Sequence, residues 1–337
     1  MDSSAQVVGQ SSAFLDAIEL ASRAAPLDRP VLVVGERGTG KELLAERLHR
    51  LSPRWDGPLV TLNCATLPEN LIEAELFGYE QGAFTGATRA RSGHFEEAEG
   101  GTLFLDELAT LSSAAQERLL RAVEYGEVAR IGARRPIAVN VRVVAATNEH
   151  LPALVEAGRF RADLLDRLAF EVITLPPLRA RGEDIPLLAG HFGRRMAFEL
   201  GWQAWPGFAP RVEQALLRHE WPGNVRQLKN VVERAVYRWG DPGNPVGAVE
   251  FDPFASPWLT RPPPVDAAVP MRPAAIENGD FRAACAAFER RLLEDALERH
   301  RYNQRAAAAG LGLSYDQLRH ALRRHGLLPS AGTRATP

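Results

Sequence analysis

Five short apolar runs mark the first half of the chain, and stretches with helical periodicity separate them. Each run is rich in Val and Leu and nearly continuous rather than alternating, the pattern of strands buried on both faces of a parallel sheet. The runs are PVLVVG (30–35), LVTLNC (59–64), GTLFLDE (101–107), NVRVVAATN (140–148) and EVITLPPL (171–178). Amphipathic segments at 41–50 and 114–126 predict helices between the strands. Residues 1–178 are therefore predicted to form an α/β subdomain with a parallel sheet.

Beyond residue 178 the apolar runs stop and helical periodicity dominates. We expect a small helical subdomain over residues 179–240. Residues 241–278 hold nine prolines, which helix interiors and central strands exclude, so this segment is predicted to be an extended linker. Helical periodicity returns over residues 279–328 and predicts a separate all-α unit there.

The composition indicates a globular protein without a membrane span. Apolar residues make up 45% of the 337 residues, and no apolar run approaches the roughly 20 residues that a membrane helix needs. The formal net charge is −2, so nucleic-acid binding has to come from a local basic patch. Cys64 and Cys285 lie in no metal-ligand spacing and favour a reducing compartment. Since no secretory signal pattern opens the chain, we expect a cytoplasmic protein.

A glycine-rich loop, GERGTGKE, follows the first predicted strand and precedes a predicted helix. Its glycines let the backbone bend so that N–H groups point at phosphate oxygens, and the helix N-terminus adds a favourable dipole. Lys41 supplies a positive charge for the β- and γ-phosphates of ATP, whereas Glu42 stands where the generic motif has a Ser or Thr that contacts Mg²⁺. A plain glycine-rich turn is the alternative, and the strand–loop–helix order argues against it. The predicted ATP-binding residues of this loop are Gly35, Glu36, Arg37, Gly38, Thr39, Gly40, Lys41 and Glu42.

Polar residues end two of the predicted strands, at the sheet edge where ligands of open α/β folds bind. Asp106 is placed to hold Mg²⁺, and Glu107 to polarise the attacking water as a general base. Two solvated acids at a strand end are the alternative, which the upstream phosphate loop disfavours. Asn148 ends another strand and suits orienting the water or sensing the γ-phosphate, but a turn-forming Asn explains it equally well on spacing alone.

Five motifs follow one another along the chain in an order that resembles a known family. They are GERGTGKE (35–42), ELFGYEQGAFTGA (75–87), GGTLFLDE (100–107), FRADLLDRL (160–168) and WPGNVRQLKN (221–230). The order is similar to that of the bacterial enhancer-binding proteins, the AAA+ activators of sigma-54 RNA polymerase. GAFTGA (82–87) is the most specific motif, and Glu42 also agrees with the phosphate loop of that family. The resemblance covers almost the whole chain and implies an AAA+ P-loop ATPase with a parallel sheet core and a helical lid.

The resemblance also implies roles for four residues outside the phosphate loop. Arg161 and Arg167 look like arginine fingers, which reach the γ-phosphate held by a neighbouring subunit. Arg226 resembles the sensor II arginine of the lid. Asn63 matches the residue that pairs with the catalytic glutamate, here Glu107, as a switch. For each arginine, an exposed surface charge or a structural ion pair is the alternative. Arginine fingers act between subunits, so they imply a homo-oligomeric ring, which we expect to be a hexamer.

The hexapeptide at 82–87 has no evident task in nucleotide chemistry. Gly82 and Gly86 flank Phe84, and this pattern predicts a hinged loop with an apolar tip. An exposed Phe is suited to contact with a partner protein. The resemblance implies that this loop contacts sigma-54 and moves with the state of the γ-phosphate. The residues alone leave a core-facing Phe in a tight turn as an equal alternative. The implied contact residues are Gly82, Ala83, Phe84, Thr85, Gly86 and Ala87.

The C-terminal unit has the pattern of a helix-turn-helix. The predicted helices are 281–299, 305–310 and 315–325. Ser314 and Gln317 have the spacing of a capping box at the start of the last helix. The first helix carries an apolar stripe, expected to face the core, of Phe281, Cys285, Phe288, Leu292 and Ala296.

This unit is also the basic part of the chain, because residues 301–325 hold five arginines and one acid. It resembles the Fis-type helix-turn-helix, in which the start of the last helix reads base edges and later arginines favour phosphates. A three-helix dimerisation or docking module is the alternative. The predicted contacts to double-stranded DNA are Ser314, Asp316, Gln317, Arg319, His320, Arg323 and Arg324.

Within the family, the chain is similar to the activators of phage-shock genes. The stretch LSPRWDGP (51–58) carries this likeness. The ATPase motifs begin at residue 35, so we expect no receiver or ligand-sensing domain ahead of them. Regulation is then expected from an inhibitory protein resembling phage-shock protein A. Trp55 is its candidate contact, with a core Trp as the alternative.

Together these features predict a transcription activator that binds enhancer DNA and uses ATP hydrolysis to convert the closed sigma-54 polymerase complex into the open one during envelope stress. An AAA+ remodelling ATPase of another type is an alternative, which the 82–87 loop and the C-terminal unit disfavour. A DNA-binding repressor with a vestigial ATPase is a second, which the intact Lys41, Asp106 and Glu107 disfavour.

Overall fold

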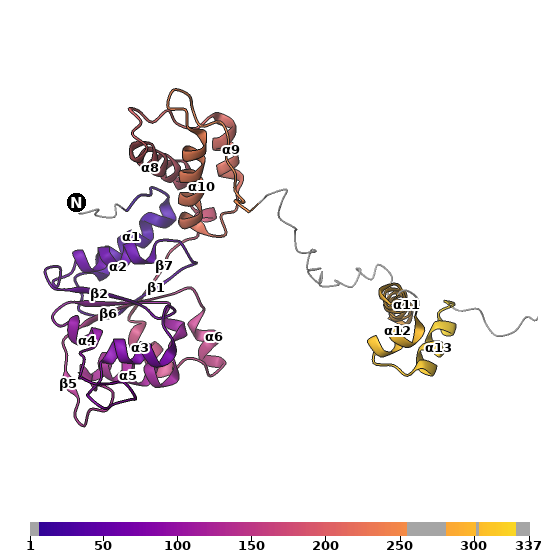
Figure 1. Ribbon diagram of the computed structural model, residues 1–337, viewed down its shortest axis with the longest axis horizontal. Coiled ribbons are helices and arrows are strands. Elements are labelled where there is room, and N and C mark those ends of the chain that lie inside the picture. The colour runs from indigo at the N-terminus through magenta and orange to yellow at the C-terminus, as the bar shows by residue number, and fades with distance from the viewer. Residues whose placement is uncertain (1–6, 255–280, 301–302, 328–337) are drawn as a thin grey trace, which may run out of the picture. The chain divides into compact units, whose positions relative to one another are not determined.

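The computed structural model describes residues 7–254, 281–300 and 303–327, which belong to two compact units (Figure 1). The first unit holds a parallel sheet with its helices and a helical lid. The second holds three helices near the C-terminal end. Within these ranges, no helix has the length and apolar character needed to cross a membrane.

A five-stranded parallel sheet forms the centre of the first unit. Its strands are β1 (Val31–Val34), β2 (Leu59–Asn63), β3 (Thr102–Asp106), β6 (Arg142–Thr147) and β7 (Glu171–Thr174). The spatial order is β2-β3-β6-β1-β7, so all five predicted strands and their parallel pairing are confirmed. In register, Asn63 lies opposite Asp106, and both end their strands at the carboxyl edge of the sheet.

Helices cover both faces of this sheet, which explains the nearly continuous apolar character of its strands. On one face lie α1 (Ser12–Ala24) and α2 (Lys41–Arg50), whose apolar residues pack with Val33, Phe104 and Val144. On the other face lie α3 (Glu69–Phe77), α5 (Ser113–Tyr125) and α7 (Ala162–Leu168), as Figure 1 shows. Alternate residues of one strand therefore enter two different cores, with Phe104 facing α2 and Leu105 facing the opposite cluster.

Two short strands stand apart from the main sheet. β4 (Glu127–Val128) and β5 (Ile137–Ala138) pair antiparallel and close a hairpin after α5. Two other short helices, α4 (His94–Glu97) and α6 (Leu151–Glu156), complete this side of the unit. These elements were not predicted, because two-residue strands and helices of one or two turns leave too few positions for a period to be recognised.

The lid is a bundle of α8 (Asp184–Glu199), α9 (Pro210–Arg218) and α10 (Asn224–Trp239) around its own apolar core. Trp221 lies fully buried in this core and donates its indole N–H to the Leu216 carbonyl at 2.8 Å. Val246 is also fully buried and pairs with Phe208, so the first residues after α10 return to the lid. The later part of the predicted linker, from residue 255, lies outside the described residues.

The second unit consists of α11 (Phe281–Arg299), α12 (Gln304–Gly310) and α13 (Tyr315–Arg324), close to the predicted helices. The predicted core stripe of α11 is partly wrong, because Cys285 and Phe288 are exposed. Ala296 is buried as predicted and Leu292 is half-buried, while Leu293 and Leu297 are also buried, next to α12 and α13. The side chain of Phe281 lies outside the described ones. The apolar face of α11 therefore meets the other helices through its C-terminal half.

Candidate nucleotide site and effector surfaces

The phosphate-binding loop connects β1 to α2, and its backbone is shaped by glycine. Gly38 and Gly40 adopt φ angles of 78° and 100°, which L side chains rarely tolerate. α2 begins at Lys41, so the N–H groups of its first turn face the loop. The local geometry is that of an anion-binding helix N-terminus.

Lys41 is buried and its ammonium group points back into the loop. Its Nζ donates hydrogen bonds to the carbonyl oxygens of Gly35 at 3.0 Å and Glu36 at 3.4 Å. Burial lowers the pKa of Lys41 from its ordinary value, and the nearby carboxylates of Asp106 and Glu107 act in the opposite direction. A phosphate group bound in the loop would therefore contact the Lys41 ammonium group, which is already partly desolvated and oriented by its hydrogen bonds to backbone carbonyls.

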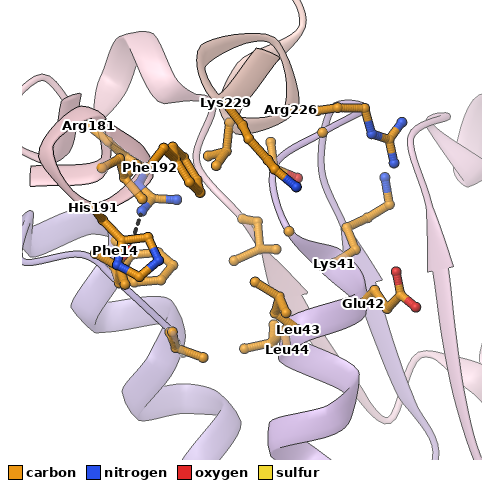
Figure 2. Close-up of a pocket in the computed structure, with 18 of the residues that line it drawn as sticks. Phe14, Lys41, Glu42, Leu43, Leu44, Arg181, His191, Phe192, Arg226 and Lys229 are labelled. Carbon is orange, nitrogen blue, oxygen red and sulfur yellow. Dashed lines mark hydrogen bonds between the residues drawn. The ribbon is translucent and has the colours of Figure 1, made fainter. Parts of the chain in front are cut away.

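A cavity of about 410 Å³ lies beside this loop, within the usual range for small-molecule sites. Figure 2 shows Lys41 and Arg226 at one end and Phe14, His191 and Phe192 at the other. The cationic end suits phosphates, and the aromatic end suits a planar base. The lining comes from the loop, residues Val7 and Val8, helix α1 and the lid.

The cavity includes most, but not all, of the predicted nucleotide-binding residues. Those that line it are Gly38, Thr39, Gly40, Lys41, Glu42, Asp106 and Arg226. Gly35, Glu36 and Arg37 are not among the lining residues. Phe14 and Lys229, for which no role was predicted, line the cavity from α1 and the lid. Phe14 belongs to no motif, so only the fold brings it to the loop, whereas Lys229 lies in the 221–230 motif beside Arg226.

Asp106 and Glu107 lie at the carboxyl edge of β3. Glu107 adopts a left-handed backbone with φ 54°, uncommon for a residue with a side chain. Its carboxylate lies 3.5 Å from Arg37 Nε. Asn63 Nδ2 contacts Asp106 Oδ2 at 3.4 Å, so the Asn63 amide is directed at Asp106 in this structure and Glu107 has an arginine partner instead.

The other implied catalytic residues lie outside the cavity of their own chain. Asn148 is exposed directly after β6. Arg161 pairs with Asp163 at 2.7 Å, and Arg167 pairs with Glu124 at 2.7 Å. Both arginines remain about half-exposed, and exposed pairs of this kind hold a side chain only weakly. Either guanidinium could exchange its partner for another anion.

A buried ion pair ties the lid to the start of the chain. Asp184 accepts hydrogen bonds from the N–H groups of Gln10 at 2.6 Å and Ser11 at 2.9 Å, and from the Arg181 guanidinium at 2.8 Å. The same guanidinium lies 3.7 Å from the ring centroid of Phe14. These contacts hold residues 7–11 and Phe14 at the aromatic end of the cavity.

The loop at 82–87 projects its aromatic tip toward solvent. Phe84 is 44% exposed and its ring meets that of Tyr79 edge-on, 5.0 Å between centroids, so a core-facing Phe is excluded. Gly82 and Gly86 adopt φ angles of 80° and 103°, and a Cβ on either would meet no atom within 4 Å. The glycines are therefore required by backbone conformation rather than by crowding.

Arg130 joins the base of this loop to helix α4. Its guanidinium contacts Glu80 at 3.1 Å and Glu96 at 2.6 Å. Hydrogen bonds from Arg130 lower the pKa of Glu96 from its usual value, against the opposing effect of burial. Arg130 is in the turn of the β4–β5 hairpin, where the Ile131 carbonyl also accepts the Glu80 N–H at 2.9 Å. The loop base is thus held by polar contacts that can be exchanged.

The three-helix unit presents a polar face on α13. Ser314 and Gln317 form the predicted capping box, with the Gln317 N–H donating to Ser314 Oγ at 3.3 Å. The residues predicted to contact DNA are all exposed, namely Ser314, Asp316, Gln317, Arg319, His320, Arg323 and Arg324. Arg324 is the one among them that forms an ion pair with α11, through Glu289. Basic side chains on a helix of this kind suit a phosphate backbone.

Trp55 lies in the turn after α2 and is 67% exposed, which excludes a core Trp. The adjacent Arg54 fixes this turn, because its guanidinium contacts Asp28 at 2.7 Å and the Asn140 carbonyl at 2.8 Å. A large aromatic side chain on a fixed turn is a typical anchor for a protein partner.

Among the described residues, no group of three or more His, Cys, Asp or Glu side chains is arranged to hold a metal ion. Asp106 and Glu42 do line the cavity, however. One or two carboxylates beside substrate phosphates are the usual protein share of a Mg²⁺ site, so the side chains present fit Mg²⁺ bound with a nucleotide.

Three protein families match the chain in consecutive segments. The Sigma-54 interaction domain matches residues 7–174, the AAA+ ATPase lid domain matches 179–248, and the Fis family of bacterial regulatory proteins matches 285–325. The first match includes the phosphate loop and the 82–87 loop, and the last includes α12 and α13.

Curated relatives and solved structures agree with these matches. The chain is 51% identical to the Psp operon transcriptional activator of Escherichia coli K12 over 95% of this chain and 97% of that protein. It is 44% identical to the anaerobic nitric oxide reductase transcription regulator NorR of Escherichia coli, covering 96% of this chain but 63% of NorR. The crystal structure of NtrX from Brucella abortus with ATP has a TM-score of 0.68 and 32% identity, over 95% of this chain and 70% of NtrX.

The predicted fold class is thereby confirmed, from the P-loop sheet and lid to the C-terminal helices. The catalytic unit is an AAA+ ATPase, and the three-helix unit is a DNA-binding helix-turn-helix. The chain belongs to the family of sigma-54-dependent transcription activators.

Proposed function

We propose that this activator binds enhancer DNA and uses ATP hydrolysis to remodel the closed complex of sigma-54 RNA polymerase into an open complex. It would act in the cytoplasm, at the promoters of phage-shock genes. The observation that carries the proposal is the position of Phe84, exposed at the tip of a loop whose base is bonded to the ATPase unit. The 51% identity to the Psp operon activator supports the choice of genes.

The nucleotide chemistry is assigned to residues at the cavity. ATP would lie with its phosphates at Lys41 and Arg226 and its base near Phe14. Asp106, with Glu42 nearby, would hold Mg²⁺, which neutralises phosphate charge when bound. Glu107 would take the proton of the attacking water, and Asn148 would orient that water or sense the γ-phosphate. Asn63 would act as a switch by leaving Asp106 and pairing with Glu107. The bound γ-phosphate would also have to compete for Arg37, since that residue now pairs with Glu107.

The active form is proposed to be a ring, expected to be a hexamer. Arg161 and Arg167 are exposed, lie outside their own cavity and are held by surface ion pairs. In a ring each pair would face the γ-phosphate of the next subunit and stabilise charge in the transition state. Hydrolysis would then depend on assembly.

Movement is proposed to reach the 82–87 loop through its polar base. Arg130 has two carboxylate partners, Glu80 on the loop and Glu96 on α4. If α4 shifts with the nucleotide state, Arg130 would change which of the two carboxylates it favours. The loop base would then move and carry Phe84 with it. The residues proposed to contact sigma-54 are Gly82, Ala83, Phe84, Thr85, Gly86 and Ala87.

Two further surfaces would connect the ATPase to its regulation. The polar face of α13 would bind enhancer DNA and raise the local concentration of the ring near the promoter. Trp55 would anchor an inhibitory protein resembling phage-shock protein A.

Transcription from a sigma-54 promoter tests this function. The assay compares an intact promoter with one melted in advance, each with and without ATP. The proposal predicts transcripts from the intact promoter only with both the activator and ATP, and ATP-independent transcripts from the melted one. Failure to open the intact promoter with ATP, by a preparation that hydrolyses ATP, would reject it.

A further inference from the structure

A polar cluster outside the cavity joins the phosphate-binding loop to the lid. The Glu36 carboxylate accepts hydrogen bonds from the two terminal nitrogens of Arg179, at 2.9 Å and 2.5 Å, and from Asn224 Nδ2 at 3.0 Å. Asn224 Nδ2 also donates to the Arg37 carbonyl at 3.0 Å. Asn224 Oδ1 accepts the Leu178 N–H at 2.7 Å. The loop, the segment before α8 and the start of α10 therefore meet at one asparagine.

Two buried residues at and just before the start of α10 have a left-handed backbone, which asparagine adopts readily and tryptophan rarely adopts. Asn224 is fully buried, and its φ of 52° lies in the left-handed region. Trp221, three residues earlier and also fully buried, has φ 54°. Backbone strain of this kind persists where the surroundings fix it, and it gathers at functional sites. The complete bonding of the Asn224 amide supplies that fixation.

Glu36 is a residue of the phosphate loop whose side chain does not serve the phosphates. It is not among the residues that line the cavity, and a carboxylate there would repel a phosphate. Hydrogen bonds from Arg179, and then from Asn224, lower the pKa of Glu36 to about 2. The carboxylate therefore stays charged and directed at the lid at any pH where the enzyme works.

The start of α10 lies directly on the loop. The Arg226 N–H donates to the Gly38 carbonyl at 3.3 Å. A Cβ on Gly38 would approach the Gly223 carbonyl oxygen to 2.4 Å, so no other residue fits beneath the lid at this point. Arg226 and Lys229 follow on the same helix and reach into the cavity (Figure 2). The seating of α10 thus sets where both cations lie.

We propose that Glu36 and Asn224 form a clamp that positions Arg226 against the phosphates, so that the loop and the lid respond to the nucleotide as one body. Both are positioning residues, since neither side chain lines the cavity. Arg179 completes the clamp from its exposed side. This inference rests on the proposed function in one respect, that ATP is the ligand of the cavity.

Two substitutions test the clamp in the full chain, with purified ATP and ADP as probes. Asn224→Gly removes the amide while glycine accepts the left-handed backbone. We expect kcat to fall about tenfold, the effect of losing a hydrogen bond to a charged group, with an equal loss of preference for ATP over ADP. Arg179→Ala is predicted to act in the same direction by about two- to fivefold, because its ion pair is half-exposed. Arg50→Ala removes an exposed arginine paired with Glu46 and serves as the control.

The thermal unfolding midpoint separates positioning from stability. A clamp predicts a lower kcat and a weaker ATP preference in folded protein, whereas a structural contact lowers only the midpoint. Unchanged kcat and ATP preference in both variants would overturn the inference, whatever the midpoint. Should Asn224→Gly not fold, Arg179→Ala decides alone. A wild-type chain without ATP turnover would count against the proposed function, and turnover insensitive to both substitutions would count against the clamp.

Discussion

The Nε atom of Arg37 lies 3.5 Å from a carboxylate oxygen of Glu107, which joins the phosphate loop to the end of β3. Glu107 is mostly buried, with 14% of its side chain exposed, and has a strained backbone. In this arrangement the carboxylate of Glu107 faces an exposed arginine. A bound γ-phosphate would compete with Glu107 for Arg37, because phosphate is a strong bidentate partner of a guanidinium group.

Glu107→Gln is predicted to abolish ATP hydrolysis and to spare ATP binding. The amide keeps the size of the side chain but cannot take a proton, and a general base contributes about 10²–10⁴-fold to a rate. Turnover and equilibrium binding of ATP, measured on one preparation, check this. Wild-type turnover in the variant would refute the role assigned to Glu107.

Arg167→Ala is predicted to lower turnover by about 10³-fold, by analogy with arginine fingers supplied in trans. Its ion pair with Glu124 is exposed, so the fold should be unaffected. Lys41→Ala should also be inactive, because it removes the cation of the phosphate loop. Mixing the two inactive chains should restore some turnover, since Lys41→Ala subunits supply Arg167 to intact loops. No recovery on mixing would indicate that Arg167 does not act across subunits.

Asp184→Asn is predicted to destabilise the chain by about 3–5 kcal/mol, because Arg181 would be left buried without its partner. Burial alone would raise the pKa of Asp184, but the N–H groups of Gln10 and Ser11 and the Arg181 guanidinium lower it overall from 3.8. The stabilisation is therefore complete above the unfolded pKa and is lost as the pH falls through the folded one.

Denaturant unfolding of the wild type and Asp184→Asn at neutral and acidic pH measures this effect. The gap in unfolding free energy should be widest at neutral pH and should shrink below about pH 4. Asp28→Asn, which removes a more exposed partner of Arg54, should cost less than about 1 kcal/mol. A gap between wild type and Asp184→Asn that does not depend on pH would contradict the assignment.

Trp55→Ala is predicted to leave ATP turnover of the isolated activator unchanged and to weaken binding of its inhibitor by about 30-fold. This corresponds to a hot spot of about 2 kcal/mol. Titration of the inhibitory protein against ATP turnover provides the measurement. Tyr237→Ala, which truncates another exposed aromatic side chain on the lid, is the matched control. Equal inhibition of Trp55→Ala and wild type would remove Trp55 from the interface.

The central strands of the sheet were predictable because they are buried on both faces. In β3, Phe104 and Leu105 enter opposite cores, so the apolar run is continuous rather than alternating. The α11 stripe was less predictable. Residues 285–290 of this helix are exposed, and Phe288 among them lies exposed where the pattern favours the core.

The cavity was predictable only where a motif carries it. Lys41 and Asp106 lie in motifs that indicate phosphate chemistry, whereas Phe14 and His191 reach the cavity through tertiary packing. Glu36 illustrates the limit of motif reasoning, because its place in the phosphate loop suggests a nucleotide contact and its side chain binds the lid. The spacing of a motif does not predict where a side chain points when neighbouring glycines have left-handed backbone conformations.

Phe84→Ala tests the central claim most directly, that ATP energy reaches sigma-54 polymerase through an exposed aromatic tip. ATP turnover and the yield of open complexes at an intact sigma-54 promoter are measured for wild type, Phe84→Ala and Phe254→Ala, both quantities on the same preparation of each protein. Phe254→Ala is the control, because it truncates an exposed Phe outside the loop. We predict that Phe84→Ala hydrolyses ATP as wild type does and forms no open complexes, while Phe254→Ala behaves as wild type in both assays. A wild-type yield of open complexes from Phe84→Ala would contradict the account.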